Sequence, residues 1–85
     1  MGYKITFKKS VSKDLRKIDI KKVKDILDKI ETELTENADK YPSLKVQFAG
    51  LRKFRVGDYR VIYSIFNDNT VLILRVAHRK KVYKK

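Results

Sequence analysis

Cysteine is absent from this sequence, and proline and glycine are scarce, with one and three residues respectively. Without cysteine the chain has no disulfide framework, no thiolate metal site and no cysteine nucleophile. No stretch approaches the roughly 20 consecutive apolar residues that cross a membrane, and residues 1–9 lack the apolar centre of a secretory signal. We therefore expect a cytoplasmic protein with no membrane partner.

The scarcity of turn-forming residues also bears on domain organisation. No linker, repeat or low-complexity segment divides the chain, so we expect a single domain over residues 1–85. Apolar residues make up 42% of the sequence, which is enough for a folded domain. A chain of this size buries only roughly 60% of its unfolded surface, so its core is small.

Acidic residues are nearly missing from the second half of the chain. Residues 1–39 hold 10 basic and 8 acidic side chains, whereas residues 40–85 hold 12 basic and 2 acidic ones. Five of the six arginines lie in the second segment. Solubility alone does not require this asymmetry, so a polyanionic partner is indicated, with nucleic acid first and an acidic protein second.

The first half shows helical periodicity after one strand. Residues 3–8 alternate apolar and polar side chains, which predicts a half-buried strand. Ser10 is expected to cap a short helix and Asp19 to cap a second one. The second helix has an apolar stripe at helical spacing, formed by Val23, Ile26, Leu27, Ile30 and Leu34.

The second half is typical of three strands. Tight turns are expected at Gly57-Asp58 and at residues 67–69, and the last strand, TVLILRVAHR, is rich in β-branched residues. The order is therefore β-α-α-β-β-β. This order predicts an α+β fold in which an N-terminal helical hairpin packs on one face of a mostly antiparallel four-stranded sheet.

Strand alternation predicts which side chains face the helices and which occupy the opposite, outer face of the sheet. The set expected toward the helices is Phe54, Val56, Tyr59, Val61, Tyr63, Ile65, Leu72, Leu74 and Val76. The set expected on the outer face is Lys53, Arg55, Arg60, Arg75 and Arg79. Arg52 falls on the helix side by alternation, so we expect it to reach out from the sheet edge.

Five cations on one face repel one another by about 1 kcal/mol per close pair at a solvent-like dielectric. The only carboxylates in this half, Asp58 and Asp68, lie in the expected turns. The cluster therefore favours a ligand that supplies negative charge, and the planar fork of arginine suits phosphate. An ordinary solvated sheet face is the alternative.

Two stretches, LRKFRVGDYRVIY at 51–63 and AHRKKVY at 77–83, resemble the RelE/ParE superfamily of toxins from bacterial and archaeal toxin–antitoxin pairs. In the RelE branch the resemblance implies a ribosome-dependent endoribonuclease that cuts messenger RNA in the ribosomal A site and inhibits translation. It also implies a RelB-like antitoxin as partner, with the toxin as a monomer within a toxin–antitoxin hetero-oligomer. No cofactor and no metal are expected, because no acidic cluster supports a divalent ion.

The same resemblance implies a catalytic set. The arginine of the family's "YR" motif falls on Arg60, the later arginine on Arg79, the tyrosine on Tyr83 and one lysine on Lys53. A second lysine position is occupied by Leu51, so Arg52 or Lys53 has to compensate. Arg55, with Arg75, Lys80 and Lys81, is expected to add RNA affinity.

Metal-free cleavage by the 2′-hydroxyl group needs a base, an acid and cations that stabilise the phosphorane. Lys53 is the candidate base because positive neighbours favour the neutral form of a lysine. Arg60 and Arg79 suit the phosphate, Arg79 or a neighbouring cation suits the acid, and Tyr83 can orient the nucleophile or stack on a base. Histidine as a residue type suits acid–base chemistry, so His78 is a further candidate, although alternation points it toward the helices.

Two other functions stay open at this point. The ParE branch shares the fold and inhibits DNA gyrase without nuclease activity, and the retention of Arg60, Arg79 and Tyr83 together favours RelE over it. The departure at Leu51 leaves room for a basic RNA-binding module without catalytic activity.

Overall fold

The structure is a computed structural model that describes residues 2–41, 50–67 and 69–78. The sheet is formed by β1 (Lys4–Phe7), β2 (Leu51–Val56), β3 (Tyr59–Phe66) and β4 (Thr70–His78). Helix α1 spans Lys9–Arg16 and α2 spans Ile20–Lys29. The second helix continues through a π-helical turn, a short α-helix and a 3-10 turn, which are η1 (Ile30–Leu34), α3 (Thr35–Asn37) and η2 (Ala38–Lys40).

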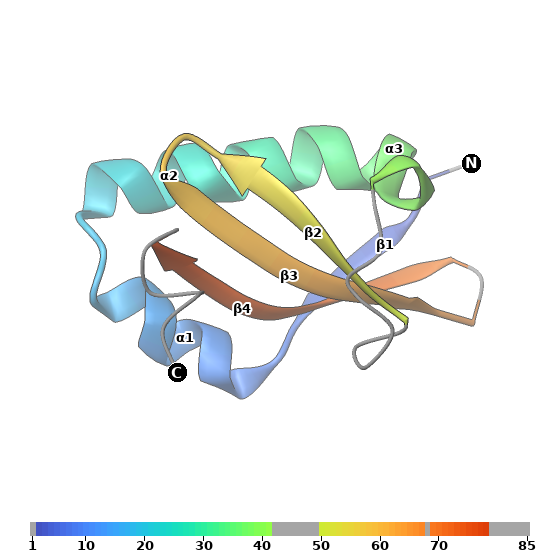
Figure 1. The fold of residues 1–85 in the computed structure, drawn as a ribbon, viewed down its shortest axis with the longest axis horizontal. Coiled ribbons are helices and arrows are strands. Elements are labelled where there is room, and N and C mark those ends of the chain that lie inside the picture. Colours follow the sequence, from blue (N-terminus) through green and yellow to red (C-terminus); the bar gives the residue numbers. More distant parts are fainter. Residues whose placement is uncertain (1, 42–49, 68, 79–85) are drawn as a thin grey trace.

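The strands lie in the order β1-β4-β3-β2 (Figure 1). β1 runs parallel to β4, and the other two pairs, β2 with β3 and β3 with β4, are antiparallel. The predicted α+β fold with the order β-α-α-β-β-β is therefore confirmed. Within the described ranges, no helix is long and apolar enough to cross a membrane.

Local sequence explains where the helices begin. Asp19 caps α2 as predicted, because its carboxylate accepts a hydrogen bond from the Lys21 backbone N–H at 3.2 Å. The expected cap at Ser10 is wrong: α1 begins at Lys9, and the Ser10 hydroxyl group instead donates to the Leu74 carbonyl oxygen at 3.2 Å. The apolar stripe of the second helix is confirmed, with Ile26, Ile30 and Leu34 buried.

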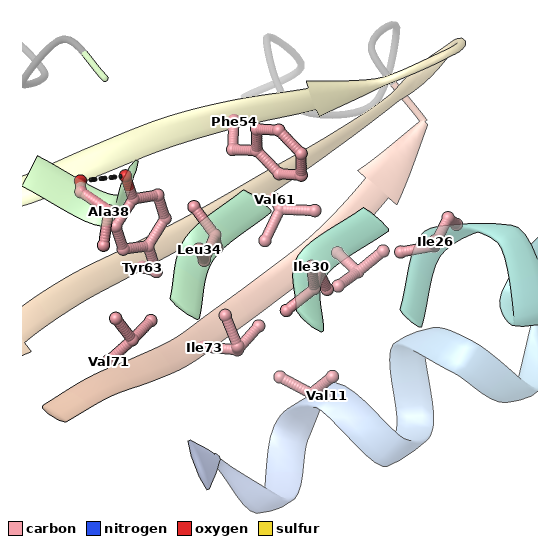
Figure 2. Close-up of a cluster of buried hydrophobic side chains, with 11 residues drawn as sticks. Val11, Ile26, Ile30, Leu34, Ala38, Phe54, Val61, Tyr63, Val71 and Ile73 are labelled. Carbon is pink, nitrogen blue, oxygen red and sulfur yellow. Dashed lines mark hydrogen bonds between the residues drawn. The ribbon is translucent and has the colours of Figure 1, made fainter. Parts of the chain in front are cut away.

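The core lies between the helices and one face of the sheet, where side chains from α1, α2 and three strands meet (Figure 2). β3 crosses its centre. Val61 and Tyr63 are fully buried, with Tyr59 and Ile65 packed against them, so the predicted alternation of this strand is confirmed. Phe54 of β2 is also buried, as predicted.

The predicted phase of β4 is wrong in its first half. Val71 and Ile73 are buried rather than Leu72 and Leu74, whereas Val76 is buried as predicted. The reason is a β-bulge: Ile62 pairs with Arg75 and Tyr63 pairs with Ile73, so Leu74 is an extra residue. The bulge shifts the alternation by one residue between Ile73 and Val76.

Helix α1 covers the edge of β4 where β1 has ended. The pairing of β1 stops at Phe7, opposite Ile73. Beyond it, the Lys8 N–H donates to the Ile73 carbonyl oxygen at 2.9 Å, and Asp14 accepts from the Val76 N–H at 3.0 Å. Together with the Ser10 bond to Leu74, these contacts satisfy backbone groups that a free sheet edge exposes.

The end of the helical run is tied to the centre of the sheet. Tyr63 is 0% exposed, and its hydroxyl group donates to the Ala38 carbonyl oxygen at 2.6 Å (Figure 2). Because the last carbonyls of a helix have no partner within the helix, this bond satisfies one of them. Burial raises the pKa of Tyr63 well above its ordinary value of 10.

We predict that Tyr63→Phe lowers the free energy of unfolding by about 1–3 kcal/mol, because it leaves the buried Ala38 carbonyl oxygen unsatisfied. Urea unfolding of both chains measures the change. Tyr3→Phe is the matched control, since Tyr3 also packs against the core and its hydroxyl group has no hydrogen bond within the described residues. An equal loss in both variants would contradict the prediction.

The same variant gives a pH prediction. The raised pKa of Tyr63 means that the folded chain keeps its hydroxyl group neutral while the unfolded chain ionises above about pH 10. The contribution of Tyr63 to stability is therefore fully present below about pH 10, and it decreases as the pH rises from there toward the raised pKa of the folded chain. The stability difference between wild type and Tyr63→Phe should fall by about 1.4 kcal/mol from about pH 9 to about pH 11. A constant difference would show that Tyr63 does not carry the effect.

Candidate functional site

The β2–β3 hairpin brings three of the predicted site cations together. Lys53 pairs with Ile62, and Arg55 pairs directly with Arg60, while the neighbouring pair of Phe54 and Val61 is buried against the helices. Side chains of a strand alternate between the two faces of the sheet. Lys53, Arg55 and Arg60 therefore share the outer face.

These cations border a pocket of about 320 Å³ at the β2 edge, lined by Tyr41, Lys53, Phe54, Arg55 and Arg60. Arg60 is partly buried and its Nε atom is shielded from solvent. Arg55 is exposed, and its Nε donates to the Gly57 carbonyl oxygen at 3.3 Å. Two arginines and a lysine at one pocket can bind a phosphate and stabilise added negative charge on it.

Strand β4 leaves room beside Arg60. The residue opposite Arg60 on β4 is Ala77, whose methyl group fills little space. Arg60 therefore has a cation on its β2 side and a small residue on its β4 side. A ligand that reaches Arg60 meets little steric hindrance from the β4 partner.

Arg75 is paired with a carboxylate. Its Nε donates to the Asp14 carboxylate at 3.0 Å, and the Arg75 side chain is 60% exposed. The carboxylates of the second half are therefore not the only ones near these cations, because Asp14 of α1 pairs with Arg75. A solvent-exposed pair of this kind contributes about 0–1 kcal/mol to stability.

Arg52 has a structural position. Its Nη1 atom donates to the backbone carbonyl oxygens of Tyr41 at 2.5 Å and Asp39 at 3.3 Å, and so holds the chain that follows η2. The predicted alternation toward the helix side agrees with the pairing of Arg52 opposite Tyr63. The guanidinium group turns to the end of the helical run rather than to Arg60.

His78 lies on the helix side of the strand end, as alternation after the bulge requires. It pairs with Tyr59, and the two rings meet edge to face with their centroids 5.4 Å apart. Both residues line a second pocket of about 250 Å³, together with Asp14, Lys17 and Arg75. His78 is therefore separated from the cluster of Lys53, Arg55 and Arg60 by the sheet.

Several predicted site residues lie outside the described residues, namely Arg79, Tyr83, Lys80 and Lys81. Leu51, at the position where the resemblance implies a lysine, begins β2 opposite Ser64 and is partly buried. Within the described ranges no group of three histidine, aspartate or glutamate side chains could hold a metal ion.

Sequence reasoning missed Asp14 and Tyr41. Asp14 reaches β4 across 61 positions of sequence, and no local pattern pairs a helical acid with a strand arginine at that separation. Tyr41 packs edge to face on Phe54 at 4.9 Å and donates to Glu33 at 2.9 Å. Burial and the hydrogen bond with Glu33 raise the pKa of Tyr41. Its position just after the helical signal gave no indication that it lines the pocket.

Known proteins share this fold and sequence pattern. Residues 5–83 match a family described as the ParE toxin of the type II toxin–antitoxin system parDE. The toxin–antitoxin complex RelBE2 from Mycobacterium tuberculosis contains a chain with 28% identity and a TM-score of 0.86; the match covers 93% of this chain and 100% of that one. A search of curated proteins gave no match.

Two archaeal structures extend the likeness. The RelE–RelB complex from Pyrococcus horikoshii matches at 29% identity and a TM-score of 0.69, over 93% of this chain and 97% of that one. The RelB–RelE complex from Methanococcus jannaschii matches at 27% identity and a TM-score of 0.67, over 92% and 94%.

Fold and sequence together define a toxin of a type II toxin–antitoxin system. The chain belongs to the ParE toxin family, because the match spans nearly all of its 85 residues. Within the wider RelE/ParE superfamily, the three similar structures described above contain RelE toxins, so the resemblance to RelE-like toxins is confirmed.

The pairing of Arg55 with Arg60 generates a prediction. Like charges directly opposite on adjacent strands are destabilising, so Arg55→Thr should raise the free energy of unfolding by about 0.2–1 kcal/mol at low salt. The gain should shrink at high salt, because the screening length falls from about 30 Å at 0.01 M to about 3 Å at 1 M.

Lys4→Thr is the matched control for this gain. Lys4 is an exposed strand cation that faces Thr70 rather than another cation, so its replacement gives the same increase in strand propensity without relieving a charge pair. Urea unfolding at two salt concentrations measures both variants. A low-salt gain in Arg55→Thr no larger than that in Lys4→Thr would contradict the prediction.

Proposed function

We propose that this toxin is a ribosome-dependent endoribonuclease that cuts messenger RNA in the ribosomal A site and is neutralised by a RelB-like antitoxin. The observation that carries the proposal is the convergence of Lys53, Arg55 and Arg60 on one pocket of the outer face. Arginine and lysine at close quarters suit a phosphodiester whose negative charge grows in the transition state.

The cleavage step uses the RNA's own nucleophile. A base takes the proton of the 2′-hydroxyl group, the 2′ oxygen attacks phosphorus, and the bond from phosphorus to the 5′ oxygen breaks. An acid protonates the departing 5′ oxygen, which leaves a 2′,3′-cyclic phosphate and a 5′-hydroxyl group. The protons and the bonds balance without a metal ion or a cofactor.

Each group has a proposed role in this step. Lys53 is the candidate base, and Arg60, whose Nε atom is shielded from solvent, is the candidate cation at the phosphorane. Arg79 as the acid and Tyr83 as an orienting or stacking group stay predictions. Arg55 is proposed to bind the adjacent phosphate, since it faces Arg60 across the hairpin.

The proposed partner is an antitoxin with acidic and apolar side chains. The similar RelE toxins from Mycobacterium tuberculosis, Pyrococcus horikoshii and Methanococcus jannaschii form complexes with RelB-type antitoxins. Acids of an antitoxin that meet Lys53, Arg55 and Arg60 would neutralise the face that RNA needs. We expect the toxin to take part in the toxin–antitoxin complex as a monomer.

Inhibition of DNA gyrase is the second candidate function. The description of the matching family favours it, because that family is named for ParE toxins. The cationic outer face suits DNA phosphates as well as RNA phosphates. The two functions differ in which polynucleotide is broken in cells that produce the toxin.

The deciding experiment is induction of the toxin, followed by mapping of messenger RNA ends on translating ribosomes. The wild-type chain should produce codon-spaced cuts, and Arg60→Ala should reduce them by about 10²-fold or more, as expected for the loss of one transition-state donor. Arg79→Ala should act in the same direction. Lys21→Ala is the matched control, because Lys21 is an exposed cation on α2, in the helical layer.

Each outcome has a defined meaning. Cuts that persist undiminished in Arg60→Ala would remove Arg60 from the site. DNA cleavage complexes without RNA cuts would select gyrase as the target. Tight ribosome binding without any cuts would indicate a binding module that has lost catalysis.

A further inference from the structure

Asp14 makes two contacts with the end of β4 through a single oxygen. Its Oδ2 atom accepts from the Arg75 Nε at 3.0 Å and from the Val76 backbone N–H at 3.0 Å. The Asp14 side chain is 13% exposed, whereas the Arg75 side chain is 60% exposed. A shielded carboxylate of α1 thus holds an accessible arginine of β4.

The bond to Val76 fixes the strand at its bulge. β1 ends opposite Ile73, so the outer edge of β4 beyond that point has no strand partner, and α1 supplies the acceptor for Val76. The extra residue, Leu74, lies directly before Arg75. A bulge bends its strand and re-aims the side chains that follow, so the acceptor at Asp14 sets the direction of Arg75.

The bond to Arg75 leaves most of its guanidinium group available. The group has five N–H donors in one plane, and Asp14 uses the one at Nε. The two Nη atoms carry the other four donors, in the fork that binds phosphate with two parallel hydrogen bonds. Because the Nε side is held, the fork is oriented before a ligand arrives.

Arg75 and Arg60 are close neighbours in the sheet. Arg60 pairs with Ala77, which is two residues from Arg75 on the same strand. Arg75 is therefore a diagonal neighbour of Arg60 on the adjacent strand, and such neighbours lie about 7–8 Å apart. Lys17 and Arg75 line the same pocket at the edge of β4, which His78 also lines.

We propose that Asp14 is a positioning residue for RNA binding: it orients the guanidinium group of Arg75 toward a backbone phosphate next to the one at Arg60. The inference rests on the proposed function in its choice of RNA as the ligand. It assigns a supporting role to an acid on a surface whose ligand is a polyanion.

This role predicts that removing the negative charge of Asp14 changes RNA affinity in the direction opposite to that expected from charge alone. Removing an acid near a polyanion strengthens binding if the acid acts only through its charge. Asp14→Asn should instead weaken binding, by at least about threefold, because Arg75 loses its charged partner. Asp25→Asn is the matched control, since it removes the same charge from an exposed position on α2 and should leave binding equal or slightly tighter.

The measurement is fluorescence anisotropy with a single-stranded RNA that carries 2′-O-methyl groups. This probe has no nucleophile, so binding is measured without cleavage. A titration from about 50 mM to about 300 mM KCl gives the salt dependence, and Arg75→Gln should reduce its slope by about one. In the Arg75→Gln background, Asp14→Asn should cause no further loss, because the two residues act as one unit.

A second readout separates this effect from a change in folding. Asparagine keeps an oxygen that can accept from Val76, so hydrogen exchange of the Val76 amide should be nearly unchanged in Asp14→Asn and faster in Asp14→Ala. Tighter binding in Asp14→Asn, or a loss that persists without Arg75, would overturn the proposal. So would a wild-type chain that does not bind the probe. Binding that follows these expectations without cleavage on ribosomes would instead overturn only the proposed enzymatic function.

Discussion

The short pairing of β1 is the constraint on which the rest of the structure depends. β1 covers β4 only as far as Ile73, so the remaining backbone groups on that edge need other acceptors and donors. Lys8, which precedes helix α1, and Ser10 and Asp14 within it supply them. These contacts hold the strand where the bulge lies, and the bulge decides that Val76 enters the core while Arg75 and Ala77 do not.

The outer face shows a conflict between stability and function. Two arginines stand directly opposite each other in a hairpin, although like charges at such positions are unfavourable. The helix side of the same strands is packed with Phe54, Val61 and Tyr63. A small core on one side therefore supports repulsion on the other, as expected where a surface is kept for a negatively charged ligand.

Much of the fold could be predicted from the sequence, because its patterns are local. The alternation of β3 and the stripe of α2 each identify a buried face without any knowledge of the partner elements. The run VLIL in β4 is apolar on both faces, so alternation alone could not find its phase, and a bulge gives no local signal. The cluster of Lys53, Arg55 and Arg60 follows from one hairpin. The restraint of Arg75 by Asp14 depends on packing between distant segments.

The pairing of the first strand with the last has a consequence for synthesis. Thr6 contacts Val71 across 65 positions of sequence, and the edge contacts of α1 also reach the final strand. The four-stranded sheet therefore cannot be completed until β4 has emerged from the ribosome that synthesises it. Until then the β2–β3 hairpin lacks its central neighbour, and Arg60 lacks Ala77 beside it. A nascent chain therefore lacks the complete surface until β4 has emerged from the ribosome.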